Sequence, residues 1–120
     1  MFGYPSIGLS DAPQIDRSRP LVRGGIVAGV NAALKTIIID APVNHGNSGG
    51  PVVQLSATNK LRIIGIATQY VPVPEDVLPL TPSGSPGSAR PPSPTGVALG
   101  NSGYGVVASA DSIIDLISTF

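Results

Sequence analysis

The chain has 120 residues, 42% of them hydrophobic, which predicts a single domain with one core. Its formal net charge is zero, so nothing indicates nucleic acid as a partner. The absence of cysteine excludes disulfides and catalytic thiols, and the single histidine argues against a metal site, so no cofactor is expected. No apolar run is long enough to predict a membrane span.

Aliphatic residues must build the core, because the chain has only three Tyr, two Phe and no Trp. The β-branched residues among them favour strands, so an all-β fold is expected. Apolar runs between turn residues predict strands near residues 22–29, 34–40, 51–55, 61–68 and 103–108. A turn at Asn59-Lys60 should join the third and fourth of these strands.

A short helix should follow the last strand. Ser109 is a candidate N-cap, and Asp111 lies in the first turn, where the helix dipole favours a negative charge. Helical spacing places four apolar residues on one face, namely Ile113, Ile114, Leu116 and Ile117. We expect this face to pack on the core rather than to bind a partner.

Residues 44–51 (Asn-His-Gly-Asn-Ser-Gly-Gly-Pro), here called the serine turn, are the most informative stretch of the chain. Glycine permits positive φ and a close approach of the backbone to a ligand. The amides of Gly46 and Ser48 could therefore point at one oxygen, as an oxyanion hole requires, beside a nucleophilic Ser48 hydroxyl. A tight surface turn without chemistry explains the same composition. Apolar runs on both sides predict that the turn joins two strands.

The turn also matches the G-x-S-x-G pattern of α/β-hydrolases, but the context of that motif is missing. The pattern requires a helix directly after the serine and a histidine further along the chain. Here Pro51 leads into β-branched residues, and His45, the single histidine, precedes the serine. An α/β-hydrolase is therefore not expected.

The stretch from Asp40 to Val53 resembles the nucleophile region of trypsin-like (chymotrypsin-fold) serine peptidases. Asn47 and the Asp40-Ala41 lead-in are more similar to the HtrA/Deg-type branch than to digestive proteases, which usually carry an aspartate in place of Asn47. Further similar segments follow in the family's order, at residues 3–5, 22–29, 63–68 and 103–109. The resemblance implies the C-terminal six-stranded β-barrel of a double barrel, formed by residues 1–120 and followed by a short helix.

The resemblance covers only part of a peptidase domain. In the chymotrypsin arrangement the histidine base and its aspartate precede the serine, yet residues 1–47 contain only His45. This implies a C-terminal half whose base and aspartate come from a missing N-terminal barrel of the same precursor. The chain alone should be inactive. A longer precursor would be secreted or periplasmic by the same resemblance.

A local triad of Asp40, His45 and Ser48 is an alternative source of the base. A base must place a ring nitrogen within about 3 Å of the hydroxyl while a carboxylate holds the other nitrogen. Three residues of tight turn leave little freedom for this geometry. By resemblance, His45 belongs instead on the rim of the specificity pocket.

The resemblance also implies residues that contact a peptide or protein substrate. Val43 and Val106 correspond to apolar pocket walls, and Pro42 stands at the pocket base where trypsin carries an aspartate. Ala67 stands where glutamate-specific relatives use a histidine, so a small or medium apolar residue is expected before the cleaved bond. Thr68 and Gln69 would offer backbone groups to an extended substrate.

Residues 71–100 depart from the family pattern, because they are rich in Pro, Ser and Gly. Such a composition predicts a mobile loop insertion that runs no strand ladder. A tolerated linker is one interpretation, since long surface insertions add little loop-closure entropy. The other is a flexible cover over the pocket.

Two functions remain open from the sequence. The first is a serine endopeptidase in which Ser48 attacks the peptide carbonyl and the Gly46 and Ser48 amides hold the oxyanion. The second is a truncated or degenerate half-barrel that binds peptides without cutting them or has no activity. An unpaired barrel would expose the apolar face that normally meets its partner.

Overall fold

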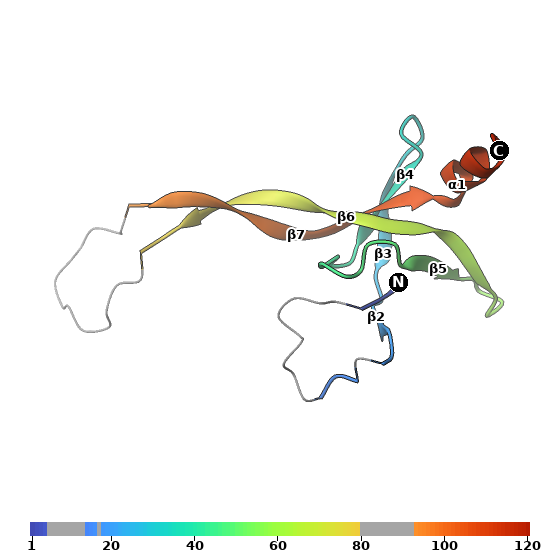
Figure 1. The fold of residues 1–120 in the computed structure, drawn as a ribbon, viewed down its shortest axis with the longest axis horizontal. Coiled ribbons are helices and arrows are strands. Elements are labelled where there is room, and N and C mark those ends of the chain that lie inside the picture. The colour runs from blue at the N-terminus through green and yellow to red at the C-terminus, as the bar shows by residue number, and fades with distance from the viewer. Residues whose placement is uncertain (5–13, 17, 80–92) are drawn as a thin grey trace.

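The computed structural model describes residues 1–4, 14–16, 18–79 and 93–120, and these are mostly β (Figure 1). The elements are β1 (Phe2–Gly3), β2 (Leu21–Val22), β3 (Ile26–Asn31), β4 (Thr36–Asp40), β5 (Pro51–Leu55), β6 (Leu61–Val77), β7 (Gly96–Ser109) and α1 (Ala110–Ile117). Strand β5 has the predicted bounds, and the predicted turn at Asn59 lies between β5 and β6.

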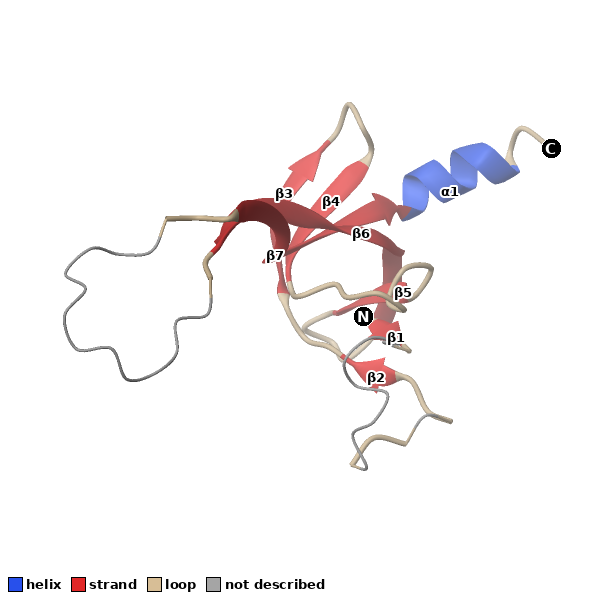
Figure 2. Cartoon of the chain, turned by 60° about the vertical axis from the view of Figure 1, so that its left-hand side comes forward, coloured by secondary structure: helices blue, strands red, loops and turns tan. Residues whose placement is uncertain are grey.

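Five of the strands form one antiparallel sheet in the order β3-β4-β7-β6-β5, while β1 and β2 form a separate pair. The sheet curls into a half-barrel with β3 and β5 at its two edges (Figure 2). The predicted six-stranded barrel is thus only partly present, because five strands share the sheet within the described residues. The strand predicted at 22–29 is divided between β2 and β3. At this division Gly25 packs so close to β4 that an added Cβ would lie 2.4 Å from the Asp40 carbonyl oxygen.

The hydrophobic core is small, and its buried members among the described residues include no aromatic side chain, in line with the prediction that aliphatic residues build it. Its buried apolar members are Met1, Ile39, Ala41, Val43, Val52, Ala67 and Val107. Strands β4, β5, β6 and β7 each contribute one of them, and Ala41 and Val43 come from the segment that enters the serine turn. Burial of apolar side chains is the main driving force for folding, so the core also fixes where the turn begins.

Strands β6 and β7 form a long hairpin that runs well beyond the rest of the sheet (Figure 1). Register pairs connect Pro72 with Asn101 and Val77 with Gly96. The prediction of a loop without a ladder is therefore wrong for residues 71–77 and 96–100. The central part of the predicted loop, residues 80–92, lies outside the described residues.

Prolines within a ladder explain why this hairpin was missed. Pro72 and Pro74 lie where β6 pairs with β7 alone, since β5 pairs with β6 only as far as Ile66. Proline is tolerated on an edge strand when its nitrogen faces away from the neighbouring strand. The valines between and beyond the prolines favour the extended conformation.

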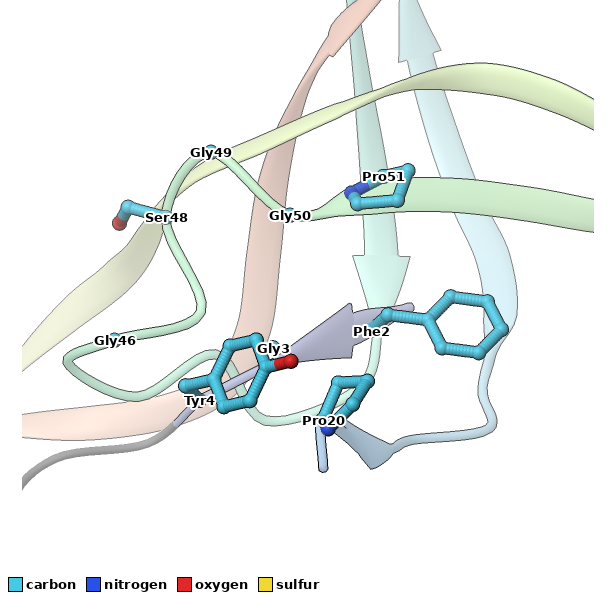
Figure 3. A pocket seen from close by; sticks show the side chains of 9 residues that line it. All are labelled: Phe2, Gly3, Tyr4, Pro20, Gly46, Ser48, Gly49, Gly50 and Pro51. Atoms are coloured by element: carbon cyan, nitrogen blue, oxygen red, sulfur yellow. The ribbon is translucent and has the colours of Figure 1, made fainter. Parts of the chain in front are cut away.

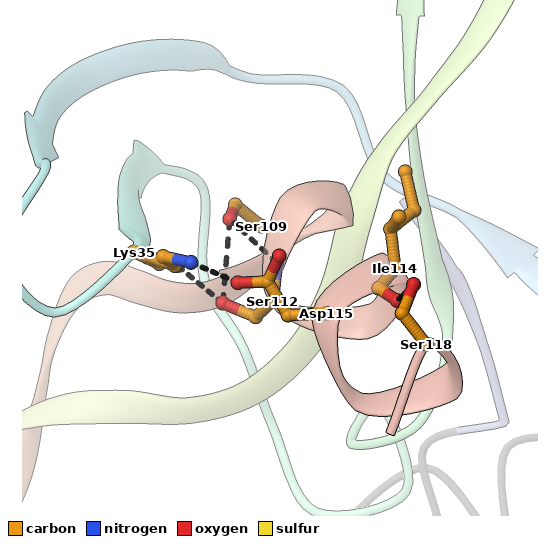
Figure 4. Close-up of polar contacts among 6 residues, drawn as sticks. All are labelled: Lys35, Ser109, Ser112, Ile114, Asp115 and Ser118. Atoms are coloured by element: carbon orange, nitrogen blue, oxygen red, sulfur yellow. Dashed lines mark hydrogen bonds and ion pairs between the residues drawn. The ribbon is translucent and has the colours of Figure 1, made fainter. Parts of the chain in front are cut away.

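Helix α1 begins as predicted, with Ser109 as its N-cap. The Ser109 hydroxyl accepts a hydrogen bond from the Ser112 amide at 3.4 Å, and the Ser112 hydroxyl donates to the Lys35 carbonyl oxygen at 3.2 Å. The Lys35 ammonium also pairs with Asp115 (Figure 4). These contacts attach the helix to the turn between β3 and β4.

The prediction that the apolar face of α1 packs on the core is wrong. None of the helix residues is buried, and Ile114, Leu116 and Ile117 are between 60% and 67% exposed. The polar contacts fix the first two turns to the β3–β4 turn, so the helix continues outward from the end of β7 instead of crossing the face of the sheet (Figure 2). Among the described residues, no helix is long and apolar enough to cross a lipid bilayer.

Candidate active site

The serine turn joins β4 to β5 through a backbone that requires glycine. Gly46 has φ of 91° and Gly49 has φ of 85°, both in the left-handed region that side chains disfavour. At Gly50 an added Cβ would lie 2.0 Å from the Phe2 carbonyl oxygen. The prediction of a glycine-dependent turn between two strands is confirmed.

Four backbone amides of the turn donate hydrogen bonds, whereas those of His45, Gly46 and Ser48 have no acceptor among the described residues. The Asn47 amide donates to the Asn44 carbonyl at 3.0 Å, and the Gly49 amide donates to the Ala67 carbonyl at 2.8 Å. Among the described residues, the amides of Gly46 and Ser48 have no hydrogen-bond acceptor. An oxyanion hole needs such free donors. The convergence of the two amides on one point stays a prediction.

Asn47 supports the turn from inside. Its side chain is completely buried, and its Oδ1 atom accepts a hydrogen bond of 3.0 Å from the Asn44 amide. Its Nδ2 atom has no partner among the described residues and lies against Gly3, where an added Cβ would be 2.2 Å away. The amide of Tyr4 donates to the Gly46 carbonyl at 3.0 Å. Strand β1 and the residue after it therefore support the serine turn.

Ser48 itself is exposed, and its hydroxyl donates to the Thr68 carbonyl at 2.8 Å. Thr68 is the extra residue of a β-bulge, because the register passes from Ala67↔Val107 to Gln69↔Val106. The Thr68 hydroxyl donates to the Val106 carbonyl at 3.0 Å and so fixes the bulge. Bulges are frequent beside active sites, where they redirect groups at a sheet edge.

His45 does not approach Ser48 as a base would. Its ring contacts Tyr70 edge-on, with ring centroids 6.3 Å apart and an interplanar angle of 76°. Asp40 lies within β4, where it pairs with Ile26 and Tyr104. Within the described residues no hydrogen bond joins Asp40, His45 and Ser48, so the structure does not assemble the local triad.

Two of the residues expected to line a substrate pocket are part of the core. Val43 is 1% exposed and Ala67 is 0% exposed, so neither side chain reaches the surface. Each side chain is part of the core, so it lies below the surface, and contact of either with substrate stays a prediction. The backbone of Ala67 instead pairs with Gly49 and with Gly50, whose carbonyl accepts from the Ala67 amide at 3.0 Å.

The other expected substrate residues lie near the surface. Thr68 and Gln69 are exposed on β6, His45 is exposed on the turn, and Val106 is half-buried. Within the described residues the outer edge of β6 has no paired strand beyond Ala67, and apart from the Thr68 carbonyl, which accepts from Ser48, such an edge offers backbone groups to an extended chain. A role for these residues in binding stays a prediction.

A cavity of about 550 Å³ lies beside the serine turn (Figure 3). Its walls are Phe2, Gly3, Tyr4, Pro20, Gly46, Ser48, Gly49, Gly50 and Pro51. In Figure 3 the Ser48 hydroxyl points away from Tyr4 and Pro20, so the cavity meets the backbone of the turn. Sequence reasoning missed Phe2, Tyr4 and Pro20 as site residues. The similarity of residues 3–5 to a family turn was the one signal that could have indicated them.

Another cavity, of about 300 Å³, is lined by Asn44, His45, Tyr70, Leu99 and Asn101. The Asn101 amide group donates to the Val43 carbonyl at 2.8 Å and to the Asn44 side-chain oxygen at 3.3 Å. These bonds connect the hairpin to the turn. Leu99 belongs to the segment that the sequence assigned to a loop, and Asn101 directly follows that segment.

No group of metal-binding side chains is found in the part of the chain that the structure describes. Comparisons with protein-family models, with curated proteins and with solved structures find no match to this chain. The function must therefore be inferred from the geometry of the serine turn.

Proposed function

We propose that this chain is the nucleophile-bearing half of a serine endopeptidase of the trypsin-like type, similar to the HtrA/Deg branch. The observation that carries the proposal is the serine turn, in which the Ser48 hydroxyl is exposed and the amides of Gly46 and Ser48 have no acceptor among the described residues. The five-stranded half-barrel is compatible with one barrel of a chymotrypsin-like double barrel. The existence of the other barrel is part of this proposal.

The chemistry follows from the groups present. Ser48 Oγ forms a bond to the substrate carbonyl carbon while its proton passes to a base from the missing barrel. The Gly46 and Ser48 amides stabilise the oxygen that becomes negative. The C–N bond then breaks, and the amine leaves with that proton. In the second step the base takes a proton from water, which attacks the ester, and the proton returns to Ser48 as the ester bond breaks. Before attack, the Ser48 hydroxyl must break its hydrogen bond to the Thr68 carbonyl and donate to the base instead.

Loss of the base lowers kcat by about 10⁶ in a triad enzyme, so the chain alone should show no turnover. The contact between Ser48 and Thr68 also favours a second candidate, a half-barrel that binds peptides without cutting them. In that case the hydroxyl only fixes the bulge, and the free amides bind backbone carbonyls of a peptide.

Replacing the missing base with free imidazole distinguishes the peptidase half from the half-barrel that only binds peptides. The chain is treated with a fluorophosphonate probe in the absence and presence of free imidazole, which can reach the exposed Ser48. The proposal predicts negligible labelling without imidazole and a rate that rises with its concentration, with the adduct on Ser48. Ser48→Ala should abolish this labelling, whereas Ser118→Ala, which removes another exposed serine, should not change it. Labelling that is independent of imidazole would show that His45 or another group acts as the base. No labelling, or equal labelling of several serines, would favour the non-catalytic half-barrel.

A further inference from the structure

The outer part of the β6–β7 hairpin, residues 72–77 and 96–101, is called the arm. Within the described part of the chain its two strands pair only with each other, because β5 ends its pairing at Ile66 and β4 pairs with β7 from Tyr104 onward. A two-stranded ribbon is marginally stable alone in water. The arm nevertheless exposes four aliphatic side chains, namely Val73, Val77, Val97 and Leu99. Apolar side chains gathered on such a ribbon mark an interaction surface.

The register divides the arm into two different faces, since residues directly opposite each other share a face. One face, called the Leu99 face, carries the pairs Pro72↔Asn101, Pro74↔Leu99 and Asp76↔Val97. The other face carries Val73, Glu75 and Val77 opposite Gly100, Ala98 and Gly96. On that second face the Glu75 carboxylate covers Gly100, where an added Cβ would lie 2.1 Å from Oε1. The Leu99 face is therefore the open apolar face.

The Leu99 face leads directly to the serine turn. Leu99 and Asn101 form one wall of the 300 Å³ cavity, and Asn44 and His45 of the turn form another. The Asn101 bonds to Val43 and Asn44 hold the arm and the turn together. A polypeptide that lies along the arm would consequently enter the cavity that Asn44 and His45 of the serine turn line.

We propose that the Leu99 face is a second binding site for the polypeptide on which Ser48 acts, and that it takes an extended, apolar segment remote from the bond that is cut. This inference rests on the proposed function. The occupant is an extended chain because the face is a narrow ribbon continuous with the cavity at the turn. Pro72 and Pro74 have no N–H group, so side-chain packing on the face, rather than strand addition along this part of β6, provides the contact.

Charge adds one preference at the outer end of the arm. Asp76 shares the Leu99 face with Val97, and the described residues of the arm include no Lys or Arg. A basic residue in the bound segment, placed beyond its apolar residues, would pair with the Asp76 carboxylate.

The test uses the whole chain and a fluorescein-labelled synthetic peptide that alternates leucine with serine and ends in lysine. Fluorescence anisotropy measures its dissociation constant. Leu99→Ser and Val97→Ser should each weaken binding about tenfold, as expected from the loss of one buried aliphatic contact. Val73→Ser and Val77→Ser are matched controls on the opposite face and should bind like the wild type. A peptide with every leucine replaced by serine should not bind.

The outcomes separate this site from the proposed hydrolysis. Equal binding by the wild type and Leu99→Ser, equal losses on both faces, or no binding at all would overturn the site on the arm. The assay involves no reaction, so Ser48→Ala should bind the peptide normally. Leu99-dependent binding without imidazole-dependent labelling would support the arm site and overturn the peptidase. Imidazole-dependent labelling together with Leu99-independent binding would support the peptidase and overturn the site on the arm.

Discussion

The Ser48 hydroxyl donates a hydrogen bond of 2.8 Å to the carbonyl oxygen of Thr68, the bulged residue of β6. The bond joins the serine turn to the sheet at the point where β6 loses its outer neighbour. It also places the hydroxyl at the edge of β6 that, within the described residues, has no paired strand beyond Ala67. The bulge thus determines where the hydroxyl lies.

Thr68→Val should loosen this bulge. The substitution removes the bond from Oγ1 to the Val106 carbonyl, which should lower the free energy of unfolding by about 1 kcal/mol. Urea unfolding measures the change. Thr95→Val is the matched control, because Thr95 donates a 3.0 Å bond to the Val77 carbonyl on the exposed arm. Only Thr68→Val should slow imidazole-dependent labelling of Ser48. Equal labelling rates in the two variants would contradict the claim that the bulge positions the Ser48 hydroxyl.

Gly50→Ala should distort the serine turn, because its Cβ would lie 2.0 Å from the Phe2 carbonyl oxygen. Overpacking of this kind lowers the free energy of unfolding by about 1–3 kcal/mol. Gly29→Ala is the control, since an added Cβ there meets nothing within 4 Å. Denaturant unfolding should show a large loss for the first variant and a small change of either sign for the second. Similar effects of the two changes would contradict the close approach of β1 to the turn.

Asn47→Asp should make stability depend on pH. The side chain at this position is completely buried, so burial would raise the pKa of the new carboxyl above its ordinary value of about 4. A raised carboxyl pKa means that the folded state binds the proton more tightly, so stability is retained below about pH 4 and falls as pH rises above it. At neutral pH the loss relative to the wild type should be about 3 kcal/mol. A difference in unfolding free energy that stays constant between acidic and neutral pH would show that position 47 is open to water.

The Lys35–Asp115 pair should hold α1 against the β3–β4 turn. The hydrogen bond to the Asp115 carboxylate and the charge of that group raise the pKa of Lys35 above its ordinary 10.5. A raised lysine pKa stabilises the folded state below pH 10.5, and this contribution is lost as pH rises further. Lys35→Met should accelerate amide hydrogen exchange in α1 at neutral pH, whereas Lys60→Met, which removes an exposed lysine from another turn, should not. Added salt should weaken the wild-type protection. Unchanged exchange in Lys35→Met would show that the Ser109 cap and the Ser112 bond hold the helix alone.

The local elements were largely predictable from the sequence, and their environment was not. The bounds of β5, the Ser109 cap and the glycine-dependent serine turn follow from residue types that act within a few positions. The burial of Val43 and Ala67, the exposure of α1 and the pairing of the arm depend on which strands are neighbours. Pro72 predicts a loop when it is read alone, but it is tolerated here because β6 has one neighbour at that point. Tyr4 joins the site only through the docking of the N-terminal segment under the turn.

The most direct test of the nucleophile assignment is a crystal structure of the chain after phosphonylation of Ser48 in the presence of imidazole. The adduct oxygen mimics the oxyanion of the peptide reaction. The predicted result is an oxygen about 2.7–3.1 Å from both the Gly46 and Ser48 amide nitrogens, with the Ser48–Thr68 bond broken. An adduct oxygen that points to solvent, with neither amide within hydrogen-bond distance, would contradict the assignment of the serine turn as an active site.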